Sequence, residues 1–278
     1  MQAFSRPVEL APGAVVGGAK PTLLAGPCVV ESYDICARIA GAVKEAALRH
    51  GFDYVFKASF DKANRTSVKS FRSIGLDAAL EVLARIRAEF EVPVVSDIHE
   101  SHQAAQVATV VDVLQIPAYL CRQTDLLVAA AETGRTVNIK RGQFMAAEDM
   151  RHAVQKVVDA GNPRALLTER GTFFGYHDLV VDMRALPLMR QYAPVIFDVT
   201  HSVQRPGGGD GRSAGNPEFA GYLARAAAAA GVDGFFIETH PVPAEALSDG
   251  PNMIRLDAMP QFLAMLKDCW DLGRRYTG

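Results

Sequence analysis

The sequence has no run of about 18 consecutive apolar residues, the length that a transmembrane helix needs. The longest candidate, at 226–236, is interrupted by Gly231 and Asp233. The N-terminal stretch places Arg6 and Glu9 where a signal peptide has its apolar core. We therefore expect no membrane association and a cytoplasmic location.

Cysteine is scarce as well. The four cysteines, Cys28, Cys36, Cys121 and Cys269, are too few and too scattered for a disulfide framework. We expect reduced thiols, one of which could ligate a metal.

Positive charge is not in excess, because Lys and Arg number 29, Asp and Glu number 31, and the formal net charge is −2. A chain with this balance has no basic field for nucleic acid. Any anion must therefore be bound by a local cluster of cations.

The first apolar run is not followed by G-x-G-x-x-G, which argues against a dinucleotide-binding Rossmann fold. The glycine-rich GGGDG at 207–211 lies in a long loop after the seventh apolar run, not at a turn from strand to helix. Its glycine content makes the loop 207–215 a candidate for a lid that closes over a substrate.

What the sequence does have is one pattern repeated eight times: an apolar or β-branched run, a polar loop and a helical segment. Near-continuous apolar strands that alternate with helices are typical of a parallel sheet covered by helices. Eight repeats in 278 residues, 49% of them hydrophobic, predict an α/β fold closed into a (β/α)8 TIM barrel. We expect one domain, 1–278, in which residues 1–20 form a short β-hairpin cap over one end. The eight runs are 22–28, 53–58, 93–98, 113–117, 136–140, 165–168, 195–199 and 234–238.

The carboxyl ends of these strands carry cations. In a barrel of this kind the reactive groups lie at those ends, and here they include Lys57, Lys62, Lys140 and Arg170. Convergent buried cations are costly unless an anion offsets their charge, so they indicate a phosphate or carboxylate ligand. The alternative is that each cation pairs with a nearby Asp or Glu.

A second group of strand-end residues has the chemistry of a metal site. Cys28, His201, Glu238 and Asp249 follow the first, seventh and eighth runs, which are neighbours in a closed barrel. One thiolate, one imidazole and two carboxylates suit a divalent transition metal. Since C-x-x-C and H-E-x-x-H are absent, however, spacing alone favours an inert buried cysteine and a hydrogen-bonded histidine.

Eight segments resemble the motifs of the 3-deoxy-D-manno-octulosonate 8-phosphate synthase family, whose members are also called 2-dehydro-3-deoxyphosphooctonate aldolases. In chain order they are LLAGPCVVES, FKASFDKANRTS, PVVSDIHE, LQIPAYLCRQTDLL, VNIKRGQF, LLTERGTFFGY, FDVTHSVQRPGG and SDGPN. The resemblance spans about residues 20–265 and implies a (β/α)8 transferase. The family condenses phosphoenolpyruvate with D-arabinose 5-phosphate and releases inorganic phosphate, in the biosynthesis of the Kdo sugar of lipopolysaccharide.

The resemblance also implies roles for individual residues. The phosphoenolpyruvate ligands of the family correspond to Lys57, Ser59, Lys62, Gln115, Lys140 and Arg170, and the pentose-phosphate ligands to Asn64, Arg65, Thr66 and Asp97. Thr66 stands where serine is usual, which keeps the hydroxyl. The implied catalytic residues are Lys62, His201, Lys140 and Asp249, with Lys62 a candidate proton donor. The family also implies a homotetramer.

The residue in the G-P-C position divides the family, because metal-dependent members have Cys there and metal-independent members have Asn. Cys28 therefore implies the metal-dependent class, with His201, Glu238 and Asp249 as the other ligands. The cofactor would be a divalent ion of the Mn, Fe, Zn, Co or Cd type. The resemblance thus reverses the interpretation from spacing alone.

Three alternatives remain open. A related aromatic-pathway synthase, which uses erythrose 4-phosphate, shares the barrel and the metal set, although KANRTS favours arabinose 5-phosphate. A Schiff-base aldolase would use Lys57 or Lys140 as its nucleophile, although crowding by other cations favours anion binding. The third alternative is a catalytically silent barrel that binds sugar phosphates.

Overall fold

The computed structural model describes residues 6–65, 67–209 and 212–277. Eight parallel strands form a closed barrel, since β11 pairs with both β8 and β14, and β14 pairs in turn with β3. The predicted TIM barrel is confirmed, and each of the eight predicted runs overlaps one barrel strand. The barrel strands are β3 (Thr22–Gly26), β4 (Asp53–Lys57), β5 (Val94–Asp97), β6 (Val113–Ile116), β7 (Thr136–Lys140), β8 (Ala165–Glu169), β11 (Val195–Asp198) and β14 (Gly234–His240).

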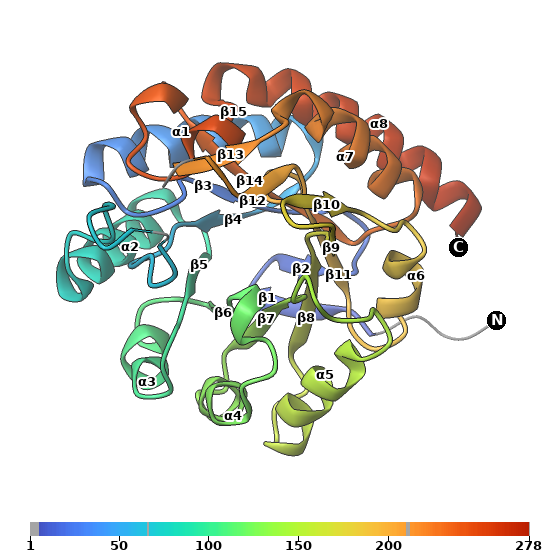
Figure 1. Ribbon diagram of the computed structural model, residues 1–278, viewed down its shortest axis with the longest axis horizontal. Coiled ribbons are helices and arrows are strands. Elements are labelled where there is room, and N and C mark those ends of the chain that lie inside the picture. The colour runs from blue at the N-terminus through green and yellow to red at the C-terminus, as the bar shows by residue number, and fades with distance from the viewer. Residues whose placement is uncertain (1–5, 66, 210–211, 278) are drawn as a thin grey trace.

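Helices surround the barrel (Figure 1) and bury one apolar stripe each against it. In α1 the buried stripe includes Cys36, Ile39 and Val43. The side chain of Ser32 caps the first turn of this helix, and Gly51 ends it in a left-handed conformation. The helices are α1 (Tyr33–His50), α2 (Leu76–Phe90), α3 (Gln103–Ala108), α4 (Thr124–Glu132), α5 (Met150–Asp159), α6 (Ala185–Met189), α7 (Ala220–Ala229) and α8 (Met259–Thr277).

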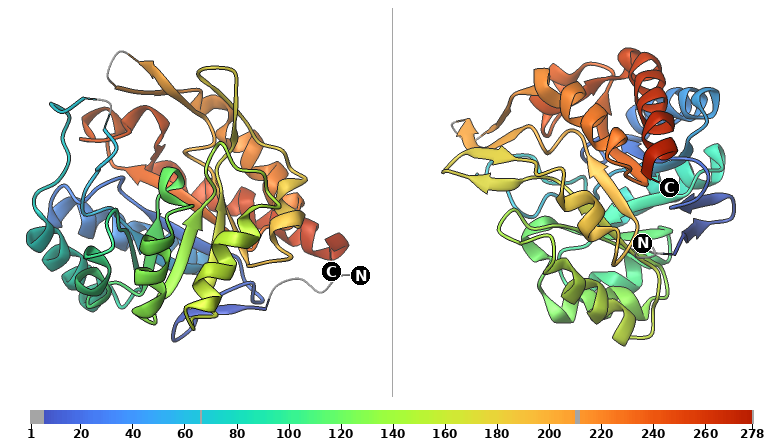
Figure 2. Two further views of the ribbon diagram at one scale, coloured as in Figure 1. Left: turned by 60° about the horizontal axis from the view of Figure 1, so that its bottom comes forward. Right: turned by 90° about the vertical axis from the view of Figure 1, so that its right-hand side faces the viewer.

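The N-terminal strands β1 (Val8–Ala11) and β2 (Ala14–Val16) form the predicted antiparallel hairpin. It lies at the bottom of the molecule in the left view of Figure 2. Its buried side chains join a cluster inside the barrel whose members are Val8, Leu10, Ala14, Val16, Leu24, Val55, Val95, Val113, Leu166, Ile196 and Phe236. The hairpin therefore covers the amino ends of the strands with apolar side chains, and the opposite end is left for polar ones.

Two further hairpins lie over the opposite end, at the top of the left view of Figure 2. They are β9 (Thr172–Phe174) with β10 (Asp178–Val180), and β12 (Gln204–Gly209) with β13 (Arg212–Gly215). The segment 207–215, predicted to be a loop, is thus largely part of a hairpin, although 210–211 lie outside the described residues. Its role as a lid stays a prediction.

Several short elements complete the chain after or between these strands. The strand β15 (Ile254–Arg255) extends the sheet beside the end of β14. The 3-10 turns are η1 (Ala118–Leu120), η2 (Pro217–Phe219), η3 (Pro243–Glu245), η4 (Gly250–Asn252) and η5 (Leu256–Ala258).

All four cysteines are free thiols, as predicted, and Cys28, Cys36 and Cys121 are buried. Within the described ranges, no helix combines the length and the apolar character that crossing a bilayer requires.

Gly26 ends β3 at a point where the neighbouring backbone leaves no room for a side chain. A Cβ atom at this position would lie 2.0 Å from the carbonyl oxygen of Lys57. Glycine is therefore required here so that β3 and β4 can carry their polar continuations side by side.

We predict that Gly26→Ala lowers the free energy of unfolding by about 2 kcal/mol or more, because the backbone of β4 must move to admit the methyl group. The measurement is urea denaturation followed by circular dichroism. Gly221→Ala in α7 is the control, since its added Cβ meets no atom closer than 3.8 Å and alanine favours a helix. Equal stability of the two variants would contradict the prediction.

Candidate active site

The carboxyl ends of all eight barrel strands open into one cavity of about 250 Å³. Its wall is predominantly polar and contains six Lys or Arg side chains against three carboxylates. The charged and ionisable residues that line it are Cys28, Lys57, Lys62, Arg65, Asp97, His99, Tyr119, Lys140, Arg170, His201, Arg205, Glu238 and Asp249. This excess of positive charge fits an anionic ligand.

Of the site residues predicted from the sequence, all but two line this cavity. Ser59 is fully buried behind the wall, where its hydroxyl donates to Asp97 Oδ2 at 2.8 Å. Thr66 lies outside the described residues. The structure therefore brings the implied phosphoenolpyruvate, pentose and metal residues to one place, with Ser59 as a supporting residue.

Two of the four strand-end cations have a carboxylate partner at hydrogen-bond distance. Lys57 Nζ lies 2.6 Å from Glu238 Oε1, and Lys140 Nζ lies 2.6 Å from Asp198 Oδ2. For these two lysines the simpler alternative holds, in which a neighbouring acid neutralises the strand-end cation.

The other two cations are less completely paired. Lys62 Nζ donates to Ser59 Oγ at 2.9 Å and lies 3.9 Å from Glu238. Arg170 Nη2 donates to Gln204 Oε1 at 2.6 Å, but its buried Nη1 has no hydrogen-bond partner in the part of the chain that the structure describes. Arg170 thus presents unused donors beside the cavity.

Arg65 repeats this arrangement near the outer edge of the cavity. Its Nε donates to the Phe71 carbonyl at 2.8 Å, while its buried Nη2 finds no partner within the described ranges. Asn64, the preceding residue, also lines the cavity. An oxyanion between these two residues would satisfy the free donor.

The buried acidic groups remain ionised because lysines surround them. Burial by itself raises the pKa of Asp97, but Lys62 and Lys57 lower it by more, so that it lies below its usual range. The pKa of Glu238 is likewise held low, chiefly by Lys57 against the effect of burial. Burial lowers the pKa of Lys62, but Cys28 in its thiolate form, together with Glu238 and Asp97, raises it above its ordinary value, so this side chain stays an ammonium.

A continuous chain of hydrogen bonds runs beneath the cavity from β8 to β4. Its central acceptor is Asp97, which receives Gln115 from one side and Ser59 from the other. The side-chain amides of Gln115 and Asn138 each donate to one neighbour and accept from another, so their orientations are fixed. The chain runs from Thr168 to Asn138 (2.7 Å), from Asn138 to Gln115 (3.0 Å), from Gln115 to Asp97, from Ser59 to Asp97 (2.8 Å) and from Lys62 to Ser59 (2.9 Å).

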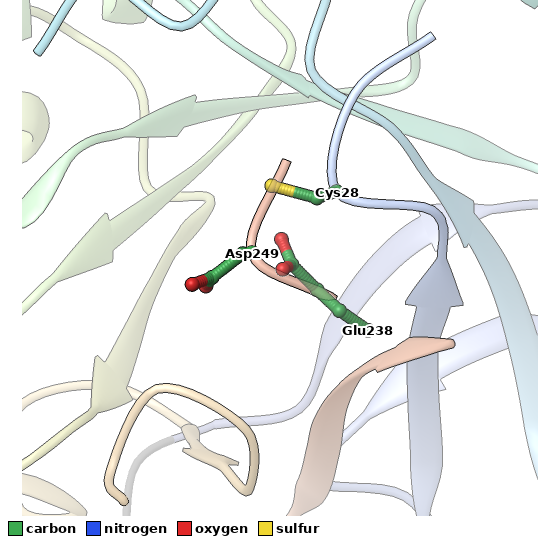
Figure 3. A group of neighbouring side chains, drawn as sticks. All are labelled: Cys28, Glu238 and Asp249. Carbon is green, nitrogen blue, oxygen red and sulfur yellow. The ribbon is translucent and has the colours of Figure 1, made fainter. Parts of the chain in front are cut away.

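Cys28, Glu238 and Asp249 converge in one corner of the cavity (Figure 3). One ligand atom from each lies within 4.8 Å of the others. His201 Nε2 lies 3.4 Å from Asp249 Oδ2 and 3.5 Å from Glu238 Oε2. The four residues predicted as metal ligands are therefore neighbours.

The chemistry of this corner fits a cation. His201 Nδ1 lies 2.8 Å from Asp198 Oδ2, a contact that orients the ring so that Nε2 faces two carboxylates. Glu238 Oε2 is buried and has no hydrogen-bond partner among the described residues. Burial, with Glu238 nearby, raises the pKa of the Cys28 thiol to about 11, so only a bound cation would make it a thiolate at neutral pH.

Asp249 occupies this corner through a strained backbone. Its φ of 56° places a non-glycine residue in the left-handed region. Asn252 stabilises that turn, since its Nδ2 donates to Asp249 Oδ1 at 3.1 Å and its backbone N–H to the Asp249 carbonyl at 3.1 Å. Gln204 Nε2 donates to the other carboxylate oxygen at 2.5 Å.

Several residues around the site received no role from the sequence motifs, among them Asp198, Asn138 and Gln204. Asp198 ends β11 three residues before His201, a spacing that places it under the imidazole. Asn138 precedes Lys140 by two on β7 and so points to the same face, which strand periodicity could have shown. Gln204 lies on a hairpin that the sequence presents as a glycine-rich loop, and no local signal marks it.

Comparison with known proteins gives the family of the chain. The model of the DAHP synthetase I family matches residues 6–274. The chain belongs to this family. It is 58% identical over 255 residues to the 2-dehydro-3-deoxyphosphooctonate aldolase of Nitratidesulfovibrio vulgaris (strain DP4), which covers 91% of this chain and 93% of the relative.

Two further relatives carry the same name. The protein of Brucella abortus (strain S19) is 58% identical over 245 residues, 88% of either chain. That of Cyanothece sp. (strain PCC 7425 / ATCC 29141) is 53% identical over 261 residues, 93% of this chain and 96% of the relative. The resemblance found in the sequence motifs is confirmed over most of the chain.

We predict that Asn138→Leu lowers the free energy of unfolding by about 2–4 kcal/mol, because Gln115 Oε1 and the Thr168 hydroxyl each lose a buried partner. Urea denaturation measures the loss. Thr136→Val is the control on the same face of β7, since its hydroxyl makes a single long contact within the described ranges, 3.4 Å to Glu9 O. A loss no larger than that of Thr136→Val would show that the hydrogen-bond chain does not support the barrel.

Proposed function

We infer that the protein condenses phosphoenolpyruvate with D-arabinose 5-phosphate and water to give 3-deoxy-D-manno-octulosonate 8-phosphate and inorganic phosphate, a step of Kdo and lipopolysaccharide biosynthesis. The observation that carries this inference is the cationic cavity, with Lys57, Lys62, Lys140 and Arg170 on its wall. The relatives at 52–58% identity that bear the aldolase name support it.

Phosphoenolpyruvate carries a carboxylate and a phosphate, and the cavity offers cations for both. Arg170 has a buried Nη1 without a hydrogen-bond partner among the described residues, and the Lys62 ammonium, which donates to Ser59, lies on the cavity wall. Lys57 and Lys140 add positive charge while their own carboxylate partners hold them in place. Such fixed cations contribute chiefly by orienting the substrate and by stabilising charge.

The pentose phosphate fits the outer part of the cavity. Arg65, with its free Nη2, and Asn64 would hold the phosphate, and Thr66 is proposed beside them from the sequence alone. Asp97 lies deeper, as an ionised acceptor for sugar hydroxyl groups. The aldehyde would then point from the rim toward the bound phosphoenolpyruvate.

In the reaction, C3 of phosphoenolpyruvate forms a bond to the aldehyde carbon, and water adds at C2. The aldehyde oxygen takes up a proton, for which the Lys62 ammonium is the proposed donor. The hemiketal phosphate then collapses with cleavage of the C–O bond, and phosphate leaves. As the alternative to ligating a metal through Nε2, His201, held by Asp198, would accept the proton that the water loses.

We propose further that Cys28, His201, Glu238 and Asp249 hold a divalent metal of the Mn, Fe, Zn, Co or Cd type. The unpartnered Glu238 oxygen and the orientation of His201 Nε2 toward two carboxylates support this proposal. A bound ion would polarise the aldehyde or lower the pKa of a water molecule.

A homotetramer and a cytoplasmic location are also proposed. The exposed aromatic side chains of the β9–β10 hairpin, Phe174 and Tyr176, favour contact between subunits. Light scattering on the purified protein tests the oligomeric state.

The competing candidate is the erythrose 4-phosphate synthase, because the matching family is described as DAHP synthetase I. Phosphate release from phosphoenolpyruvate with each aldose phosphate decides between the two, and we expect arabinose 5-phosphate to be preferred. A Schiff-base mechanism is disfavoured because Lys57 and Lys140 are held as ion pairs. Borohydride trapping with pyruvate would reveal it.

We predict that Cys28→Ala abolishes stoichiometric binding of a divalent metal, because the only sulfur ligand of the proposed set is lost. Metal content per chain is measured by mass spectrometry after growth with added Mn²⁺, Fe²⁺ or Zn²⁺. Cys36→Ala, which removes another buried thiol, is the control and should keep its metal. Chelation should in parallel abolish phosphate release, and full activity of metal-free protein would refute the proposal.

We predict that Arg65→Ala raises the KM for arabinose 5-phosphate about 30-fold or more, the effect of losing a charge-assisted contact of about 2 kcal/mol. The KM for phosphoenolpyruvate should change less than about threefold. Arg72→Ala, in the same loop but ion-paired with Asp61, should change neither. Equal losses for both substrates would place Arg65 elsewhere in the mechanism.

A further inference from the structure

A buried ion pair lies directly behind two of the cations that face the cavity. Arg141 Nε donates to Glu169 Oε2 and Arg141 Nη2 to Glu169 Oε1, both at 2.6 Å. Arg141 follows Lys140 at the end of β7, and Glu169 precedes Arg170 at the end of β8. Both partners are buried, and neither lines the cavity. Two parallel hydrogen bonds fix an angle as well as a distance.

Glu169 also holds the backbone on both sides of Arg170. Its Oε1 accepts a hydrogen bond from the Gly171 N–H at 2.6 Å, so that the carboxylate bridges across the intervening residue. Gly171 has a φ of +90°, a conformation that other residues rarely adopt. The direction in which Arg170 leaves the strand therefore depends on this carboxylate.

Arg141 makes the corresponding contacts on the other strand. Its backbone N–H donates to the Thr168 carbonyl at 2.8 Å, which extends the β7–β8 ladder past Lys140. Its guanidinium also donates to the Met145 carbonyl and to Thr172 Oγ1, the latter at 2.8 Å. One side chain thus joins the end of β7 to the start of β9.

The orientation of the Arg170 side chain depends on its neighbours. The pairs found among the described residues include no carboxylate partner for it, and its only side-chain acceptor is Gln204. We propose that the Arg141–Glu169 pair is a positioning device that sets the separation of Lys140 and Arg170, and thereby the affinity for the anionic groups of phosphoenolpyruvate. This inference rests on the proposed function.

A second buried pair provides a matched control at the opposite end of the barrel. Arg190 Nε and Nη2 donate to the two oxygens of Asp233 at 3.0 and 2.9 Å, again in a two-point contact. Asp233 also accepts from the Val195 N–H at the start of β11. Removing either acid takes a two-point carboxylate contact from a buried arginine, so both changes should destabilise the fold to a similar degree.

The test compares Glu169→Gln with Asp233→Asn by calorimetric titration with phosphoenolpyruvate and by thermal unfolding. Both variants should unfold at a temperature about 10 °C lower. Only Glu169→Gln should raise the dissociation constant for phosphoenolpyruvate, by about tenfold or more, since small displacements of binding groups are costly. Its KM for arabinose 5-phosphate should change less than about threefold.

Glu169→Asp keeps the charge but shortens the reach, so it should remain folded and still bind phosphoenolpyruvate several-fold more weakly. Wild-type affinity in a folded Glu169 variant, or an equal loss in Asp233→Asn, would overturn the inference while leaving the proposed function intact. Absence of phosphoenolpyruvate binding by the unchanged protein would instead refute the proposed function, and this inference with it.

Discussion

The structure depends on charge compensation in a place that water scarcely reaches. Lys57, Glu238 and Asp198 are buried at the upper end of the barrel, where an unpaired charge would be strongly destabilising. Close pairs neutralise most of these groups. Among the charged side chains that the structure describes, Arg65, Arg170 and Glu238 keep a buried atom without a hydrogen-bond partner, and they mark where the charge of a ligand must come from. The positions of these three groups indicate where the charged parts of a bound ligand lie more directly than the shape of the cavity does.

The inside of the barrel changes character in layers from one end to the other. Strand β7 shows this on one face, because Thr136, Asn138 and Lys140 alternate inward along it. Thr136 meets the N-terminal hairpin, Asn138 belongs to the hydrogen-bond chain, and Lys140 reaches the cavity. Strand β7 thus contacts the N-terminal hairpin at one end, the buried hydrogen-bond chain in its middle and the cavity at its carboxyl end.

Much of this could be predicted from the sequence, and the failures have physical causes. The strands were recognisable as apolar runs because both of their faces are buried. The polar residues that follow them could be assigned to one site because the carboxyl ends of the strands converge in a closed barrel. The partners of the cations could not be predicted: Lys57 and Glu238 are 181 positions apart, and only the register of β3, β4 and β14 brings them together.

Ser59 and the segment 207–215 show two other limits. Ser59 has the spacing of a ligand, and its role as one stays a prediction. Its hydrogen bond to Asp97 could not be predicted, because that contact depends on packing around β5. The hairpin β12–β13 contains glycines that disfavour strands, and pairing between its two arms overrides that preference. Local composition cannot predict an outcome that tertiary contacts determine.

The corner that holds Cys28, Glu238 and Asp249 lies at the seam where the first barrel strand meets the last. The hydrogen bond between Cys28 and Ser248 joins groups 220 positions apart, so most of the 278-residue polypeptide lies between them. Contacts of such long range form late, because the chain must first lose the entropy of closing a very large loop. Until β14 and the loop that follows it have docked, the sheet is open, has two exposed edges and lacks the assembled site. The pairing of β14 with β3 therefore closes the barrel and completes the site in the same folding step.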